Sequence, residues 1–512
     1  MLCQPPSSRL LVRMLATVAA LVTLSPLVAC GTEQSAAPGT TTLTVAIQAT
    51  PSSLDPAQLD DTEQGYLWSA LYDTLLQTDN TGKPQPNAAE SWSYSGDART
   101  LTMKLRAGMT FTSGAPVNAA AVEATIERTK ATPGQVQGLL STVSTVQAPD
   151  DTTVVLELSR PDAGLLPALA MGAGVIADPA TVNQERTALN PVASGPYTLD
   201  TAQTVNGSVY VLHRRDDHWN AAYPFRTVNI RVLQDCTATF NALQAGEVNA
   251  GSAEIVHVDR LKALGFRETT VQANSLATLV LVDRKGELLP PLGDLRVRTA
   301  INKAFDRQKI IDTLLRGSGK STVQPFNPKG PGYDPALEKT YTYDVEAANR
   351  LMSDAGYPNG FAVTIPEVPY AKPFTPTVTQ ALAAIGINVT WEPIPSQQST
   401  SAFASKKYPM YLNVEAVTSY PRELSRFQVD SPRNAFRTED PKLTALVNRY
   451  NSEQDPAAAA PIAKQISAFL VANAWDALLF DLSRHWMTKD GIVYLGDGTQ
   501  AVSNIRLFGL TG

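Results

Sequence analysis

Cysteine, histidine and clusters of basic residues are scarce in this 512-residue chain. It has three cysteines and four histidines, and it contains no Gly-x-Ser-x-Gly, His-Glu-x-x-His or paired-cysteine motif. The histidines stand at irregular spacings that match no common metal site; they are His213, His218, His257 and His485. The sequence therefore predicts no resident metal, no other cofactor and no enzymatic activity.

Basic residues are fewer than acidic ones, and the formal net charge is -6 at pH 7. No cluster of lysine or arginine offsets this balance, and such a surface does not suit a nucleic acid. We therefore expect no nucleic-acid partner.

Long apolar runs are limited to one, from Met14 to Val28. It follows Arg9 and Arg13 and is too short to span a bilayer comfortably, as in a signal peptide. The run ends in Leu27-Val28-Ala29-Cys30, which resembles a bacterial lipobox, whose cysteine is acylated and becomes the first mature residue. We predict a lipoprotein signal peptide over 1–29 and lipidation of Cys30. The alternative is ordinary secretory cleavage with Cys30 there by chance.

Residues 30–42 are small, polar and aperiodic, which predicts a flexible tether. The protein is thus expected to be exported and held by lipid at the outer face of the bacterial cytoplasmic membrane. Once Cys3 is removed and Cys30 is lipidated, Cys236 is the only thiol left, so we expect no internal disulfide.

The mature chain alternates short strands with amphipathic helices, the pattern of an α/β fold. Asn118 and Asp344 are predicted helix caps, and Gly356 a helix end. The predicted strands are 42–47, 101–106, 153–158, 209–214, 228–233, 276–282, 362–365, 388–391, 408–414 and 477–482. A further helix is predicted from Leu295 to Phe305.

Several ordered motifs cover most of the mature chain. They are Ser53-Leu54-Asp55-Pro56, Leu71–Leu75, Asn87–Trp92 with Leu101–Phe111, Ser113–Ala119, Asn190–Tyr197, Ala242–Val248, Leu295–Arg307 and Tyr343–Tyr357. Together they resemble the extracytoplasmic solute-binding proteins of peptide, nickel and opine ABC importers, bacterial family 5.

The resemblance implies a two-lobed periplasmic-binding-protein-like fold of type II, in the large peptide-binding subclass, with mixed sheets. Two extended crossings are expected near 276–284 and 477–484. Lobe I would take residues 43–280 plus 485–512, with an inserted subdomain at about 81–190, and lobe II would take 281–484. Most motif residues are expected to set turns and core positions rather than a site.

One motif resembles a phosphate-binding loop, Gly317-Ser318-Gly319-Lys320-Ser321-Thr322. Leu314 stands where the first glycine of such a loop belongs, and the segment follows a helix instead of a strand. A phosphate cradle is therefore not expected.

Ligand specificity is expected to depend on residues 408–427. Peptide-binding members of the family have a Trp and then an Asp there, and the Asp holds the ligand's α-ammonium. Glu415 and Thr418 stand at about those positions. Strand alternation places Tyr411, Asn413 and Glu415 on one face, which either lines the ligand pocket or meets water. Further candidate ligand contacts are Tyr420, Arg422, Tyr66 and Trp68.

The sequence thus supports a lipid-anchored, monomeric substrate-binding protein that captures a peptide-like or other small polar solute between two lobes. Hinge closure would then deliver the solute to an ABC permease. The alternative is a cell-envelope lipoprotein that keeps this fold but has lost transport and has a regulatory or scaffold role.

Overall fold

The computed structural model describes residues 42–511 except 50, 51, 62, 80–82, 418, 432 and 497–502. The predicted signal peptide, Cys30 and the tether up to residue 41 lie outside the described residues, and so does Thr418. The structure records Cys236 as disulfide-bonded, which contradicts the expectation of no internal disulfide. That expectation assumed that Cys3 is removed and that Cys30 is lipidated, and both lie outside the described residues. In the described part, no helix has both the length and the apolar character needed to cross a bilayer.

The largest sheet joins two lobes. Its strands, in spatial order, are β15 (Tyr411–Ala416), β12 (Arg267–Val280), β16 (Ala477–Thr488), β11 (Ala250–Ala253), β1 (Thr42–Ile47), β10 (Thr227–Val232), β9 (Val209–Arg214) and β8 (Tyr197–Leu199). β1 runs parallel to β10 and β11, and all other neighbours are antiparallel.

In the described part of the chain, four smaller sheets contain the remaining strands. A four-stranded antiparallel sheet contains β4 (Ala89–Tyr94), β5 (Thr100–Leu105), β7 (Thr153–Leu158) and β6 (Val143–Asp150). The two-stranded sheets are parallel β13 (Phe361–Glu367) with β14 (Ile387–Pro393), and antiparallel β2 (Leu76–Thr78) with β3 (Pro84–Pro86) and β17 (Ile492–Tyr494) with β18 (Phe508–Leu510).

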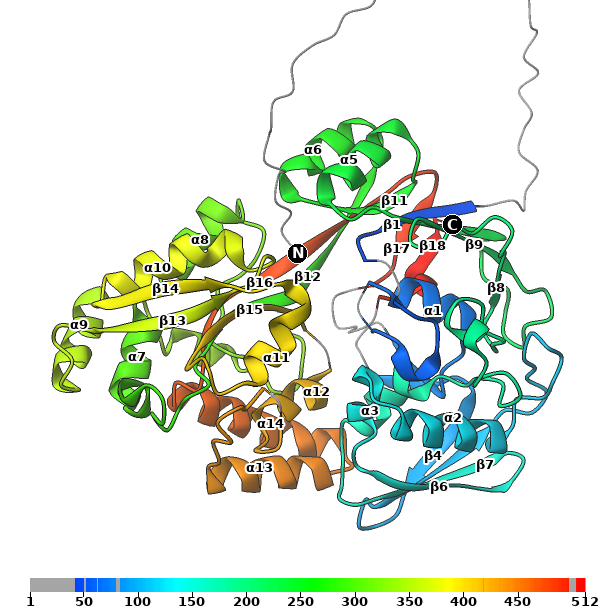
Figure 1. Ribbon diagram of the computed structural model, residues 1–512, viewed down its shortest axis with the longest axis horizontal. Helices are drawn as coiled ribbons and strands as arrows, with labels where there is room; N and C mark the ends of the chain where they lie inside the picture. Colours follow the sequence, from blue (N-terminus) through cyan, green and yellow to red (C-terminus); the bar gives the residue numbers. More distant parts are fainter. Residues whose placement is uncertain are drawn as a thin grey trace, which may run out of the picture.

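The described residues also form α-helices. They are α1 (Gly65–Leu71), α2 (Ala119–Ala131), α3 (Gln135–Leu139), α4 (Leu165–Leu169), α5 (Cys236–Ala245), α6 (Ile255–Ala263), α7 (Leu295–Lys303), α8 (Arg307–Leu314), α9 (Val345–Asp354), α10 (Thr375–Ala383), α11 (Ser399–Ala404), α12 (Tyr420–Leu424), α13 (Pro441–Ser452) and α14 (Pro456–Ala472). In Figure 1, α13 and α14 lie opposite the part of the other lobe that carries α2 and α3.

The long strands β12 and β16 are the two crossings between the lobes (Figure 1). Along β12, Val271 belongs to one hydrophobic core and Ala277 to another. Along β16, Phe480 belongs to the second core and Trp486 to the first. The two-lobed fold with two crossings is therefore confirmed, while the boundaries at 280 and 485 and the inserted subdomain stay a prediction.

Most local predictions are confirmed. Asn118 Oδ1 accepts a hydrogen bond from Ala121 N at 3.1 Å and caps α2. Asp344 caps α9 in the same way. The expected strand at 408–414 begins only at Tyr411, and the intervening Pro409 has no N–H to give to a ladder.

Candidate functional site

The candidate site lies where the segment before α1 in lobe I faces α12 in lobe II. Asp61 Oδ2 lies 3.5 Å from Arg422 Nη1, and the Asp61 side chain is only 9% exposed. Asp61 Oδ1 also accepts a hydrogen bond from Gly172 N at 3.0 Å. Burial raises the pKa of Asp61, and the positive charge of Arg422 opposes that shift. The lobes thus meet through a buried carboxylate and a guanidinium.

A second acid of the same segment binds to a crossing strand. Glu63 Oε1 accepts a hydrogen bond from Arg484 of β16, and its Oε2 accepts one from Gln48 N at 3.1 Å. Burial acts to raise the pKa of Glu63, but Arg484 outweighs it, so the pKa lies below its usual value. Glu63 therefore stays ionised beside the crossing.

Other contacts also bridge the lobes. Arg160 Nη2 lies 3.5 Å from Asp430 Oδ2, and Arg160 Nη1 lies 3.4 Å from Gln428 Oε1. Gln454 Nε2 donates to the Ser95 carbonyl at 2.9 Å. The structure therefore holds the lobes in contact at several points on the side of α12.

Glu415 is an ion-paired residue. Its two carboxylate oxygens contact Arg426 and Arg433, and Arg426 also contacts Glu423. The Glu415 side chain is 12% exposed, next to a cavity of about 20 Å³, which is room for one water. Glu415 is therefore not a single carboxylate but part of a cluster with two guanidinium groups.

The predicted polar face of β15 does not meet water. Tyr411 is 2% exposed and stacks on Phe403, with ring centroids 4.0 Å apart. Asn413 is buried, and its Oδ1 accepts a hydrogen bond from the Tyr370 hydroxyl at 3.0 Å. The alternative of a solvated face is wrong, because tertiary packing covers it.

Three other candidates lie in hydrophobic cores. The Tyr420 ring packs 4.4 Å from that of Phe326, and Tyr66 packs against Trp486. Trp68 is buried and donates its Nε1–H to the Asp60 carbonyl at 2.9 Å, which fixes the backbone beside Asp61. Direct ligand contact by these three residues stays a prediction, while their packing shows that they stabilise the fold.

Sequence reasoning missed the acids of lobe I and three arginines. Asp61 and Glu63 follow the Ser53–Pro56 motif closely, so that acidic segment was a usable signal. The arginines Arg426, Arg433 and Arg484 carry no local pattern that marks them, because their partners come from other elements.

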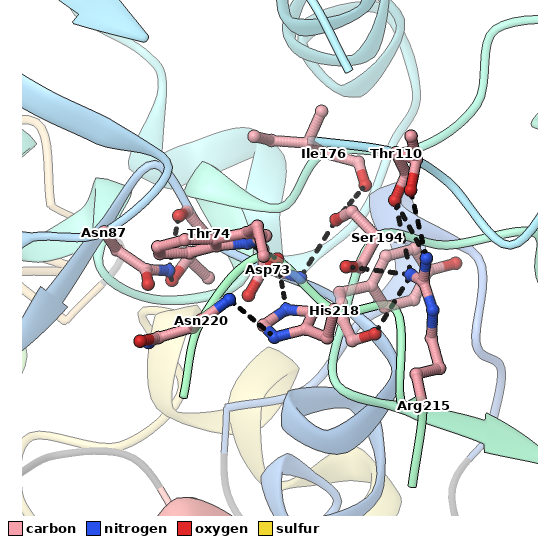
Figure 2. Close-up of polar contacts among 12 residues, drawn as sticks. Asp73, Thr74, Asn87, Thr110, Ile176, Ser194, Arg215, His218 and Asn220 are labelled. Atoms are coloured by element: carbon pink, nitrogen blue, oxygen red, sulfur yellow. Dashed lines mark hydrogen bonds and ion pairs between the residues drawn. The ribbon is translucent and has the colours of Figure 1, made fainter. Parts of the chain in front are cut away.

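A buried polar network lies inside lobe I (Figure 2). Asp73 accepts hydrogen bonds from His218 Nε2 at 3.0 Å and from Trp219 Nε1 at 2.8 Å, and it pairs with Arg506. Burial acts to raise the pKa of Asp73, but the hydrogen bond from His218 and the charge of Arg506 hold it below its usual value.

The same network includes several family motifs. Ser194 Oγ accepts from Asp73 N at 3.1 Å, and Arg215 Nη1 donates to the carbonyls of Thr110 and Ser194 at 3.2 and 3.3 Å (Figure 2). Asn87 Nδ2 donates to the Thr74 carbonyl at 2.8 Å. These residues join loops to each other, so the motifs act on the fold, as expected.

No group of three or more His, Cys, Asp or Glu side chains suited to a metal occurs among the residues that the structure describes.

Comparison with known proteins identifies the family. A family model described as "Bacterial extracellular solute-binding proteins, family 5 Middle" matches residues 83–429. The chain belongs to this family. Its fold also matches the solute-binding proteins below, as the two crossings had indicated.

Among curated proteins, the chain is similar to the glutathione-binding protein GsiB of Escherichia coli (strain K12), with 27% identity over 333 residues. That match spans 63% of this chain and 62% of the relative. The GsiB of Pectobacterium atrosepticum matches at the same identity over 326 residues, with the same coverage.

Solved structures give matches over nearly the whole fold. DppA from Helicobacter pylori in complex with the peptide STSA has a TM-score of 0.78 at 22% identity, covering 93% of this chain and 99% of that one. The binding protein AgaA from A. tumefacien R10, in complex with agropinic acid, has a TM-score of 0.78 at 24% identity, covering 92% and 99%. At these identities the likeness concerns the fold alone.

Proposed function

We propose that this protein is the substrate-binding protein of an ABC importer, which captures a peptide-like or other small polar solute between its lobes and delivers it to a permease. The family membership supports this. The observation that carries it is the Asp61–Arg422 ion pair, in which each lobe supplies one charged group.

The distribution of charge favours a zwitterionic ligand. Lobe I brings Asp61 to the interface, and lobe II brings Arg422. A ligand ammonium would pair with Asp61, and a ligand carboxylate with Arg422. Each charged hydrogen bond of this kind contributes about 1.5–3 kcal/mol net. In this proposal Glu415 orients Arg426 and Arg433. This role replaces the expectation that Glu415 alone receives the ligand ammonium.

Hinge closure is the proposed mechanism. A ligand that contacts Asp61 and Arg422 together does so only when the lobes are close, so its binding shifts the population toward the closed form. β12 and β16 would absorb the motion, because they are the strands that both lobes share.

The membrane attachment rests on the sequence. The order of Arg9, Arg13, the apolar run and Leu27–Cys30 supports cleavage after residue 29 and acylation of Cys30. The 30–42 tether would then hold a monomeric protein near its permease at the outer face of the cytoplasmic membrane.

A transport-inactive lipoprotein is the second candidate. It is favoured by the internal pairing of the charged groups described above, since Asp61, Glu63 and Glu415 each already contact an arginine. A ligand would have to displace at least one such contact.

Native mass spectrometry of the protein purified from its host separates the two candidates. The transport proposal predicts a complex with a small molecule, released as a peptide-like or other zwitterionic solute on denaturation. A nickel chelate or an opine would keep the transport function and change the ligand. Ligand-free protein that also binds no member of a di- and tripeptide library, opine set or metal-chelate set would favour the second candidate.

A further inference from the structure

Ser318, His485 and Glu268 form a hydrogen-bonded chain on the shared strands. Ser318 Oγ lies 2.6 Å from His485 Nε2, and Glu268 Oε1 lies 2.6 Å from His485 Nδ1. The residues come from the turn after α8, from β16 and from β12, and 217 positions separate Glu268 from His485. No local motif could reveal this arrangement.

The charge of Glu268 fixes the direction of these hydrogen bonds. Burial acts to raise its pKa, but hydrogen bonds from Lys262, His485 and Thr270 outweigh burial and place the pKa below its usual value. An ionised carboxylate can only accept a hydrogen bond. His485 Nδ1 therefore carries the hydrogen and donates a hydrogen bond to Glu268. In neutral His485, Nε2 is then the acceptor for the Ser318 hydroxyl.

The backbone holds Ser318 in this position. Lys320 N donates to Asp481 Oδ1 at 3.1 Å, and Asp481 N donates to the Lys320 carbonyl at 2.8 Å, so the turn is docked on β16. Gly319 has a φ of +151°, and a Cβ there would lie 2.4 Å from the Asp481 carbonyl oxygen. The Gly-Ser-Gly sequence thus serves close approach to the strand rather than phosphate binding.

A cavity of about 150 Å³ gives access to the pair. Ser318 and His485 line it, and so do the apolar side chains Leu314, Leu315 and Leu482 and the charged side chain Arg484. A cavity of this volume accepts a molecule about the size of benzene. It therefore has room for a short acyl group but not for a long one.

We propose that Ser318 is a nucleophile for short-chain acyl esters, with His485 as its general base and Glu268 as a positioning residue. A nucleophile in hydrogen-bond contact with a base, which a third group orients, is the arrangement that activates a serine. This activity would be additional to solute binding. Ser318 follows α8 in lobe II, whereas His485 and Glu268 lie on the crossing strands within predicted lobe I, so the arrangement bridges the two lobes.

The reaction balances without a cofactor. Ser318 Oγ forms a bond to the ester carbonyl carbon while its proton passes to His485 Nε2. The ester C–O bond then breaks, and the leaving alcohol takes that proton. Water attacks the acyl-serine with His485 again as base, which releases the carboxylic acid and restores Ser318. Arg484 lies in the same cavity wall, where its guanidinium is paired with Glu63.

Labelling of the wild-type protein is the primary test. A fluorophosphonate with a short alkyl chain reacts by forming an O–P bond at the activated serine and losing fluoride, while the serine proton passes to the base. After digestion, mass spectrometry is expected to place the label on Ser318. Absence of label, or label only at another residue, would overturn the proposal.

Variants test the roles of the three residues. Ser318→Ala should abolish labelling, and His485→Gln should slow it by about 100-fold or more, the usual effect of losing a general base. Ser252→Ala, which removes another hydroxyl of the cavity wall, is the matched control and should label like the wild type. Equal rates in wild type and His485→Gln would refute the role of the base.

Glu268→Gln distinguishes positioning from a purely structural role. It should lower the labelling rate at saturating reagent while leaving the half-saturating reagent concentration unchanged. Unchanged melting temperature with a lowered rate supports the role, and an unchanged rate in a folded variant excludes it. Hydrolysis of p-nitrophenyl acetate, sensitive to Ser318→Ala, is the corresponding turnover assay.

Discussion

Arg422 of α12 and Asp61 of the opposite lobe form an ion pair of 3.5 Å in which the carboxylate is almost fully buried. This pair links two segments that are 361 positions apart in the sequence. Because burial of a single carboxylate is costly, Asp61 depends on a partner from the other lobe or from a ligand. Substitution of either residue of the pair should therefore change both the contact between the lobes and the affinity for the solute.

Asp61→Asn should weaken solute binding by about ten- to a hundred-fold, because it removes one charged hydrogen bond to the ligand ammonium. Calorimetry with the co-purified solute measures this. Asp60→Asn changes the neighbouring acid and is the control, for which the dissociation constant should stay the same. Equal constants for Asp61→Asn and the wild type would remove Asp61 from the site.

Glu415→Gln should lower the free energy of unfolding of the ligand-free protein by about 1–3 kcal/mol, because Arg426 and Arg433 lose a buried acceptor. Urea denaturation measures the change. Glu346→Gln breaks an ion pair with Arg350 at the protein surface and should change stability by less than about 0.5 kcal/mol. If both variants behave alike, the Glu415 contacts contribute nothing to the fold.

Asp481 predicts a pH dependence of stability. Burial raises its pKa from 3.8 to about 6. The folded state therefore keeps this proton between about pH 4 and pH 6 while the unfolded chain releases it, so this group makes the protein less stable as the pH rises through that window. Asp481→Asn should reduce this loss, because the amide stays neutral. Denaturation at pH 4.5 and pH 7 checks the difference between variant and wild type, and an identical pH slope in both would contradict it.

Cys30→Ala should abolish lipidation and release the protein from the membrane. Metabolic labelling with palmitate, followed by fractionation of cells into membrane and soluble parts, measures both effects. Cys236→Ala is the control and should remain lipidated. Label on the Cys30→Ala protein would show that acylation occurs elsewhere or not through the predicted lipobox.

Local patterns predicted the elements well because they depend on neighbours in the sequence. Asn118 and Asp344 cap the helices that their positions indicated, and alternation along β15 correctly grouped Tyr411 with Glu415. What covers that face did not follow from the strand itself, since Phe403 and Arg433 come from other elements.

The candidate site was harder to predict for the same reason. Asp61 meets Arg422, Glu63 meets Arg484 and His485 meets Glu268 only through tertiary structure. Pairs of residues that are far apart in the sequence leave no periodicity or motif that marks them. Tyr66 and Trp68 resembled ligand contacts for a different reason, because aromatic residues suit both hydrophobic cores and ligand pockets.

Small-angle scattering tests the central claim of ligand capture by hinge closure most directly. The protein is stripped of solute by unfolding and refolding, and its radius of gyration is measured with and without the co-purified solute at saturation. We expect a smaller radius of gyration for the wild type with solute, and a smaller contraction for Asp61→Asn at the same solute concentration. An unchanged radius in the wild type, with calorimetry showing that the site is full, would contradict it.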